Sequence, residues 1–414
     1  MTDGAGEQPG ESSGPHGGRW AWAEIDVGAV AHNVGVLRAT VAPASIWAVV
    51  KADGYGHGAV EVGRTALGAG AAGLCVALVS EAVALRTAGV TAPILVLSEQ
   101  PSEQAVDIVA HRLIATVATL GGIAALAAAA EGAGGPSGAD PSGGADGAGR
   151  AGRGSLAVHL KIDTGMHRVG AAPGDAAALV AAIAARPSLR LAGVFTHLAV
   201  ADELADPETD CQLQRFDEVL AELPDPPSRA DRHGVDDEVA VHAANSAGAL
   251  AHAGARRSLV RAGIALYGVS PGPDLDALAT PLRPVMSLKA RVSFVKRLRA
   301  GERLSYGLRH TMPADANVAT VPIGYADGVR RSLSGRGAPV LIGGRRREII
   351  GTITMDQLMV DCGDDDVAVG DEVVLIGGQG AEQIRAEEWA DRLDTIGYEI
   401  VCGIGARVPR RYVR

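Results

Sequence analysis

The sequence predicts an α/β protein with two domains, an N-terminal (β/α)8 TIM barrel followed by a C-terminal, mostly β domain. Two observations lead to this prediction. Up to about residue 270, eight short apolar runs alternate with alanine-rich stretches of helical character, as a closed barrel requires. After about residue 275 the helical stretches shrink, and Val- and Ile-rich runs recur with turn residues between them.

The barrel strands are predicted from continuous apolar runs, which are typical of parallel strands buried on both faces. These runs are 45–51, 73–79, 93–98, 112–117, 156–163, 191–198, 239–246 and 259–268. The stretches between them that we expect to be helical include 59–70, 80–88, 103–110, 119–130 and 174–186. A doubly wound open sheet would fit the same alternation, but the count of eight favours the barrel.

The predicted domain boundaries follow changes in composition. Residues 1–18 are rich in Gly, Ser and Pro and are expected to be a disordered tail. The barrel domain is expected at 19–270, with a flexible low-complexity insertion at 131–154 in a surface loop. The β domain, 271–414, is expected to consist of hairpins with one late helix at 380–394, and Arg345–Arg347 to form a solvated turn.

The bulk composition excludes several kinds of partner. Hydrophobic residues make up 47% and charged residues 21%, and the net charge of -10 disfavours nucleic acid, whose phosphates need clustered cations. No apolar stretch of about 18 residues occurs, so no membrane span is expected. Without a secretory signal pattern, the expected location is the cytoplasm. The four cysteines are widely spaced, and the apolar surroundings of Cys75 and Cys402 predict buried thiols.

The carboxyl ends of barrel strands form the active site in this architecture, and here they carry polar groups. The first run ends in Lys51, followed by Ala-Asp-Gly-Tyr-Gly-His-Gly. A lysine after a buried strand is partly desolvated, which suits a Schiff base with an aldehyde. A lysine that only reaches solvent at the rim is the alternative. The glycines around Tyr55 favour the first interpretation, because they let the backbone approach a ligand.

Other strand ends add compatible groups. The fifth run continues from Lys161 to Arg168, and the sixth ends in His197, although a lone histidine at a strand end is more often structural. The seventh ends in His242-Ala-Ala-Asn-Ser246 and the eighth carries Arg261-Ala-Gly263-Ile264, which offer a hydroxyl and a backbone N–H for an anion. A lysine nucleophile with phosphate-binding groups and an arginine is the set that a phosphorylated aldehyde cofactor needs.

Several motifs in one order resemble the alanine racemases. They are AVVKADGYGHG, KIDTGMHRVG, ANS, RAGIALYG, SYG, GYADG and TMDQ, and the similarity runs from about Trp20 to Arg411. The resemblance implies a racemase that interconverts L- and D-alanine with pyridoxal 5'-phosphate (PLP), supplying D-alanine for peptidoglycan. It also implies a homodimer with shared active sites.

The resemblance also assigns roles to residues. Lys51 is implied to hold PLP and to act as one base, and Tyr306 to act as the opposite base from the partner subunit. Cofactor binding is further implied for Tyr55, His197, Ser246, Arg261, Gly263, Ile264 and Tyr398. Substrate binding is implied for Arg168, Met355, Asp356 and the entrance residue Tyr325, and carbamylation for Lys161.

These residue types explain the expected chemistry. Racemisation removes the α-proton on one face and returns it on the other, so two bases must flank the carbon. An arginine such as Arg261 cannot give up its proton, so the pyridine nitrogen it faces would stay unprotonated. This limits the electron sink and disfavours decarboxylation and transamination.

Three other functions were compared with the racemase. A PLP decarboxylase would have a carboxylate in place of Arg261, and a PLP carrier without turnover would not need Tyr306 or the β domain. A metal-dependent barrel enzyme would need a third ligand beside His197 and His242, and no metal is expected. Two departures from the family pattern, His167 and Asp53, leave serine or another small amino acid open as the substrate. His167 either alters the carboxylate site or faces solvent, and Asp53 is expected only to support its loop.

Overall fold

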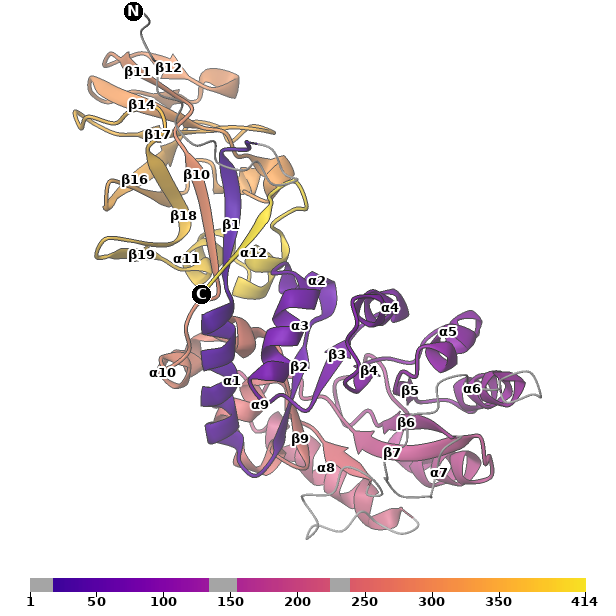
Figure 1. Cartoon of the computed structure of the whole chain (residues 1–414). Helices are drawn as coiled ribbons and strands as arrows, with labels where there is room; N and C mark the ends of the chain where they lie inside the picture. The colour runs from indigo at the N-terminus through magenta and orange to yellow at the C-terminus, as the bar shows by residue number, and fades with distance from the viewer. Residues whose placement is uncertain (1–17, 134–154, 224–238) are drawn as a thin grey trace, which may run out of the picture. The chain divides into compact units, whose positions relative to one another are not determined.

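The computed structural model describes residues 18–133, 155–223 and 239–414 (Figure 1). These divide into two compact units. The barrel unit consists of Asp26–Val285, Thr395–Cys402 and Val413–Arg414, and the β unit of the described residues up to Ile25 with Met286–Asp394 and Gly403–Tyr412. Apart from Gly18, the predicted tail lies outside the described residues, as do residues 134–154 of the predicted insertion.

The barrel unit contains eight parallel strands in two hydrogen-bonded halves, with the orders β4-β3-β2-β9 and β5-β6-β7-β8. The strands are β2 (Ser45–Val49), β3 (Gly73–Val76), β4 (Ile94–Val96), β5 (Ala115–Val117), β6 (Leu156–Lys161), β7 (Leu189–Phe195), β8 (Ala240–His242) and β9 (Leu259–Ala262). Each lies within or overlaps one of the eight predicted runs.

The two halves close into a barrel through hydrogen bonds at both seams. Between β4 and β5, the Ile114 N–H donates to the carbonyl oxygen of Ile94 at 2.9 Å. Between β8 and β9, the Ser258 N–H donates to Val241 at 2.9 Å and the Arg261 N–H to Ala244 at 3.0 Å. The predicted TIM barrel is therefore confirmed, and the open sheet is excluded.

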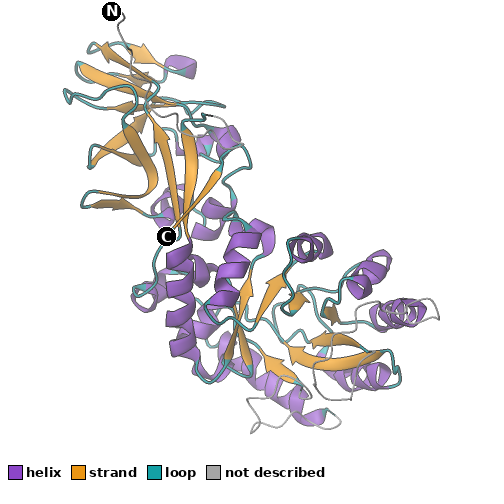
Figure 2. Cartoon of the chain, viewed as in Figure 1, coloured by secondary structure: helices purple, strands orange, loops and turns teal. Residues whose placement is uncertain are grey.

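Helices cover the outside of these strands (Figure 2). The strands are buried on both faces, as β3 shows, where Leu74, Cys75 and Val76 are all fully buried. The longer helices of the unit are α1 (Val27–Val41), α3 (Ala59–Gly68), α4 (Val79–Thr87), α5 (Ala105–Ala110), α6 (Leu120–Ala133), α7 (Ala176–Ala184), α8 (Glu208–Glu222) and α9 (Ser246–Ala251). The unit also contains α12 (Gly397–Cys402) and the shorter helices α2 (Lys51–Tyr55) and α10 (Asp276–Ala279).

The turn α2 is left-handed. Ala52, Asp53, Gly54 and Tyr55 all have φ between 51° and 61°. Each non-glycine residue in this conformation costs roughly 1–2 kcal/mol, because its Cβ crowds a carbonyl oxygen. The turn nevertheless closes regular hydrogen bonds, from the Gly54 N–H to Val50 at 2.8 Å and from the Gly56 N–H to Ala52 at 2.9 Å.

The β unit is built on a ten-stranded sheet with a separate two-stranded hairpin. The sheet strands are β1 (Ala21–Asp26), β10 (Met286–Arg291), β11 (Phe294–Leu298), β14 (Ala316–Val321), β15 (Pro339–Ile342), β16 (Arg345–Ile350), β17 (Leu358–Asp361), β18 (Glu372–Gln379), β19 (Glu382–Ile384) and β20 (Arg410–Val413). The hairpin is β12 (Arg303–Leu304) with β13 (His310–Thr311), and one helix, α11 (Ala386–Leu393), accompanies them. The mostly β character of the C-terminal domain is confirmed.

Four local expectations differ from the structure. Residues of β1, expected in the barrel domain, pair with β10 instead, and only Asp26 begins the barrel unit by capping α1. Arg345–Arg347 form part of β16 rather than a turn, because they pair with 340–342 of β15 and the turn is confined to Gly343 and Gly344. The late helix is shorter than predicted, since 382–384 form β19. Residues 131–133 continue α6 rather than a loop.

Candidate active site

A cavity of about 540 Å³ lies at the carboxyl ends of the barrel strands, and ten of the predicted site residues line it. These are Lys51, Tyr55, Lys161, Arg168, His197, Ser246, Arg261, Gly263, Ile264 and Tyr398. Lys161 lies in β6, Arg261 in β9 and Tyr398 in α12, and the others lie in the segments that follow β2, β6, β7, β8 and β9, all within the barrel unit. Nine of the ten lie on or after barrel strands, where the barrel rule expects an active site.

The cavity is strongly cationic. Lys51, Lys161, Arg168 and Arg261 line it, and no carboxylate is found among its described lining residues. Burial lowers the pKa of Lys51, and the nearby Arg168 lowers it further. Burial also lowers the pKa of Lys161, to about 8, with help from Arg261 and Arg168. The neutral amine, which is the nucleophilic form of lysine, is therefore more accessible at both positions than in an exposed lysine.

Arg261 is buried and held by four acceptors. Its Nη1 donates to His242 Nδ1 at 2.6 Å, and its Nη2 donates to the carbonyl oxygens of Thr196 and Ala243 and to His197 Nδ1. Burial lowers its pKa to about 10, so the guanidinium stays protonated at neutral pH. A guanidinium can only donate, so the ring nitrogens that face it must be acceptors.

This requirement fixes the tautomer of His242, which accepts a hydrogen bond from Arg261. Burial and the charge of Arg261 hold the pKa of His242 well below its usual value, so the ring is neutral. With Nδ1 as the acceptor, its proton lies on Nε2, which donates to His159 Nδ1 at 2.9 Å. Phe195 stacks on His242 with ring centroids 4.6 Å apart. The guanidinium carbon of Arg261 lies 5.2 Å from the centroid of the Phe195 ring. The arginine is therefore held in one orientation by a neutral, buried chain.

A second group of residues that line the cavity is suited to a phosphate. The Ser246 hydroxyl accepts from the backbone N–H groups of Gly263 at 2.9 Å and Ala265 at 3.2 Å. A Cβ on Gly263 would lie 2.7 Å from Tyr55 Oη, so only glycine leaves this cradle open. Burial raises the pKa of both Tyr55 and Tyr398, so their phenols remain protonated donors. Because the Ser246 oxygen accepts from these two N–H groups, its own O–H, together with the two phenols, can donate to phosphate oxygens.

Arg168 is held by the turn that follows β6. Asp163 Oδ1 accepts from the Gly165 N–H at 3.1 Å and from the His167 N–H at 3.0 Å. The side chain of His167 is 85% exposed, which agrees with the surface interpretation of this residue. Asp53 Oδ1 likewise accepts from the Ala59 N–H at 2.9 Å, in agreement with its expected role in supporting a loop.

The remaining four predicted residues belong to the β unit. Tyr306, Tyr325, Met355 and Asp356 are all exposed. Segment 352–356 links them, because the Thr352 hydroxyl donates to the Tyr306 carbonyl oxygen and the Tyr325 N–H donates to Thr354. Asp356 is ion-paired with Arg407 at 2.7 Å. These residues therefore form a second group, which we call the β-unit cluster.

Some participants were not recognised in the sequence as site residues. Phe195 lies at the end of β7 and lines the cavity, and His159 supports His242 from β6. Both face the barrel interior, and strand alternation from Lys161 could have indicated His159. Cys402 also lines the cavity and is exposed, so the prediction of a buried thiol was wrong, because α12 ends there.

Comparison with known proteins identifies the family. The sequence model of the alanine racemase N-terminal domain matches residues 25–271, and that of the C-terminal domain matches residues 285–412. The chain belongs to the alanine racemase family. As a member of this family, the racemase is an isomerase that acts on alanine.

Individual relatives cover nearly the whole chain. The racemase is 45% identical to the alanine racemase of Symbiobacterium thermophilum, over 96% of this chain and 98% of that one. Identity to the alanine racemase of Thermobifida fusca is 42%, over 95% and 98% of the two chains. The solved alanine racemase from a D-cycloserine-producing Streptomyces lavendulae is 39% identical, with a TM-score of 0.83 over 96% and 98% of the chains.

The described part of the racemase has neither a membrane-spanning helix nor a metal-binding cluster. None of its helices is both long enough and apolar enough to cross a bilayer. No group of three or more His, Cys, Asp or Glu side chains in this part of the chain is arranged to hold a metal ion.

Proposed function

We propose that the racemase interconverts L- and D-alanine with PLP bound in the barrel cavity, by proton transfer between two bases on opposite faces of the substrate. The observation that carries the proposal is that Lys51 lies among cations in a cavity that also contains the phosphate cradle of Ser246 and Gly263. Bound PLP supplies an electron-withdrawing ring that stabilises negative charge on the α-carbon of an attached amino acid.

The residues of the cavity have distinct roles in this proposal. Lys51, with its lowered pKa, attaches the cofactor and moves the α-proton on one face. Tyr55, Ser246, Gly263, Ile264 and Tyr398 hold the phosphate. Arg261 would donate to the ring nitrogen of the cofactor, and because a guanidinium cannot accept a proton or readily release one, that nitrogen would stay unprotonated and side reactions would be limited. Arg168 holds the substrate carboxylate, and His197 lies beside Arg261, with its ring Nδ1 3.1 Å from Nη2.

The second base in the proposal is Tyr306 from the other subunit of a homodimer. Two observations support this. Its side chain is 73% exposed in the single chain, and the exposed Leu308 lies beside it, so both are available for a partner. Met355, Asp356 and Tyr325 would complete the substrate pocket and its entrance as part of the same β-unit cluster.

The proposed location of the racemase is the cytoplasm, and the proposed use of its product, D-alanine, is in peptidoglycan. All four cysteines of the chain are free, which fits a reducing compartment. A strain that loses the gene should then require added D-alanine for growth.

Exchange of the α-proton of L-alanine in deuterium oxide, with chiral analysis of the product, tests the activity. We expect deuterium to appear in both L- and D-alanine. Lys51→Ala should abolish the visible absorbance of the bound cofactor, whereas Tyr306→Phe should retain it and lose proton transfer on one face. Exchange with serine but not with alanine would contradict the substrate, and a Tyr306→Phe enzyme of normal rate would contradict the two-base assignment.

A further inference from the structure

The carboxylate of Glu81 joins two loops at the carboxyl end of the barrel. Its Oε1 accepts from the Ala52 N–H at 2.6 Å, and its Oε2 accepts from the N–H groups of Ala77 at 2.9 Å and Leu78 at 3.1 Å. Ala52 directly follows Lys51, and Ala77 lines the active-site cavity. Glu81 thus contacts the backbone beside the nucleophile from a different βα unit.

The Ala52 N–H needs this acceptor. It lies in the first turn of α2, where backbone N–H groups have no partner within the helix. The turn is left-handed and strained at Ala52, Asp53 and Tyr55, so contacts from outside must favour it over a right-handed turn. A carboxylate acceptor forms a stronger hydrogen bond than a neutral one, and the distance of 2.6 Å is short.

We propose that Glu81 is a positioning residue for Lys51. By accepting the hydrogen bond from the Ala52 N–H, Glu81 fixes the left-handed turn and thereby the place of the lysine amine in the cavity. The inference rests on the proposed function of Lys51 and assigns no direct contact with substrate or cofactor to Glu81.

A simpler role for Glu81 would be to cap its own helix. Its bond to the Leu78 N–H caps α4, and that bond alone would stabilise the loop without affecting Lys51. Glu99 provides a matched control for this role. It accepts from the N–H groups of Ala118 and Thr119 and from the Thr119 hydroxyl, one βα unit further along the barrel, and it is partly buried like Glu81.

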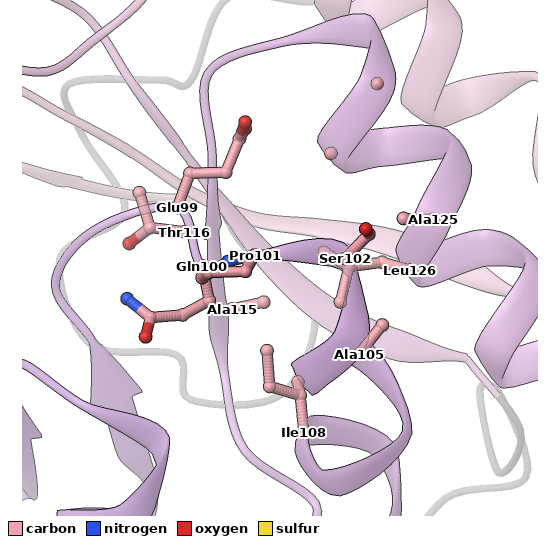
Figure 3. A pocket seen from close by; sticks show the side chains of 12 residues that line it. Glu99, Gln100, Pro101, Ser102, Ala105, Ile108, Ala115, Thr116, Ala125 and Leu126 are labelled. Atoms are coloured by element: carbon pink, nitrogen blue, oxygen red, sulfur yellow. The ribbon is translucent and has the colours of Figure 1, made fainter.

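Glu99 lines a different pocket, of about 260 Å³, together with Ser102, Thr116 and Leu126 (Figure 3). It is not among the residues that line the active-site cavity. Glu81→Gln and Glu99→Gln therefore each weaken a carboxylate clamp of the same kind, but only the first touches the turn after Lys51.

The experiment compares these variants as full-length, PLP-loaded enzymes in three measurements. They are amide hydrogen exchange in 51–56, the pH titration of the visible absorbance of the bound cofactor, and kcat against KM for alanine. In Glu81→Gln we expect faster exchange at Ala52, a shifted midpoint of the titration, and a kcat lower by about tenfold, as for the loss of one hydrogen bond to a charged group. KM should change much less. Glu99→Gln should match the wild type in all three.

Glu81→Asp guards against a general loss of structure. Its carboxylate, one methylene shorter, can cap α4 but cannot also reach Ala52, so it should reproduce the effects of Glu81→Gln with the thermal stability of the wild type. Equal behaviour of the Glu81 and Glu99 variants would overturn the proposal. If the wild-type chain itself shows no cofactor absorbance, the proposed function fails instead, and unchanged exchange at Ala52 in Glu81→Gln would then reject the positioning role independently.

Discussion

Gly263 and Lys161 show how single residues determine the shape and the charge of the cavity. In the phosphate cradle, position 263 favours glycine, because a Cβ there would lie 2.7 Å from Tyr55 Oη. Burial of the Lys161 amine, together with the positive charges of Arg261 and Arg168, lowers its pKa to about 8.

Gly263→Ala should weaken PLP binding by about tenfold or more, because the added methyl group displaces the Tyr55 phenol from the cradle. Gly254→Ala is the control, since a Cβ there meets only Leu213 Cδ1 at 3.8 Å, an ordinary contact. Fluorescence titration of the apoenzyme with PLP measures both. Equal affinities of the two variants would show that the cradle tolerates a side chain.

Lys161 should take up carbon dioxide in a pH-dependent manner. Only the neutral amine forms a carbamate, so uptake should be small below pH 8 and rise as the pH passes through about 8, well below the range of an exposed lysine. Nuclear magnetic resonance of the protein in isotope-labelled bicarbonate would detect the carbamate. Lys161→Met should lack the signal, and a signal that persists in this variant would assign the carbamate to another amine.

At the scale of elements, α2 is the exception in an otherwise regular barrel. Three of its non-glycine residues have positive φ, at roughly 1–2 kcal/mol each. The Ala52 N–H donates to Glu81 and the Ala59 N–H donates to Asp53, and these hydrogen bonds offset part of this cost. The turn directs the chain away from β2 immediately after Lys51.

Ala52→Gly should leave the free energy of unfolding unchanged or raise it slightly, because glycine has no steric penalty at positive φ. The matched control is Ala84→Gly in α4, where an exposed alanine of a right-handed helix loses about 1 kcal/mol on the same change. Urea unfolding curves measure both. A loss at Ala52 as large as that at Ala84 would mean that the turn is not left-handed in solution.

The sequence predicts regular elements well and this turn not at all. Apolar runs located all eight barrel strands, because burial on both faces leaves a continuous signal. The left-handed turn depends on Glu81, which lies in the next βα unit, so no local pattern reveals it. For the same reason β1 was misplaced, since its pairing with β10 joins residues far apart in the chain. Ten cavity residues were located by the strand-end rule or by family resemblance, whereas Phe195 and His159, which face the barrel interior, were not.

At the scale of the whole molecule, the two bases of the proposed mechanism lie in different units. The barrel unit carries Lys51 and the phosphate cradle, and the β unit carries Tyr306 in its exposed cluster. Nothing in the sequence pattern reveals whether Tyr306 acts in its own chain or in a partner, so only the resemblance suggested the second.

Mixing two inactive variants decides this question. If Tyr306 acts from the partner, a dimer of one Lys51→Ala chain and one Tyr306→Ala chain contains one site with both native residues and one with neither. Activity should then return as subunits exchange, towards about half of the wild-type rate for each mixed dimer. No recovery, with exchange confirmed by native mass spectrometry, would place both bases in one chain.

Arg261 also has a consequence for how this protein can change over evolutionary time. It lies on β9, at the edge of one half-barrel, and its donors reach Thr196, His242 and Ala243 at the ends of strands in the other half. The group that restrains the cofactor is thus also a tie across one seam of the fold. A lineage that replaced it to acquire decarboxylase chemistry would have to re-satisfy buried carbonyl groups at the same step. Substitution of Arg261 during evolution is therefore constrained by the stability of the fold as well as by selection on activity.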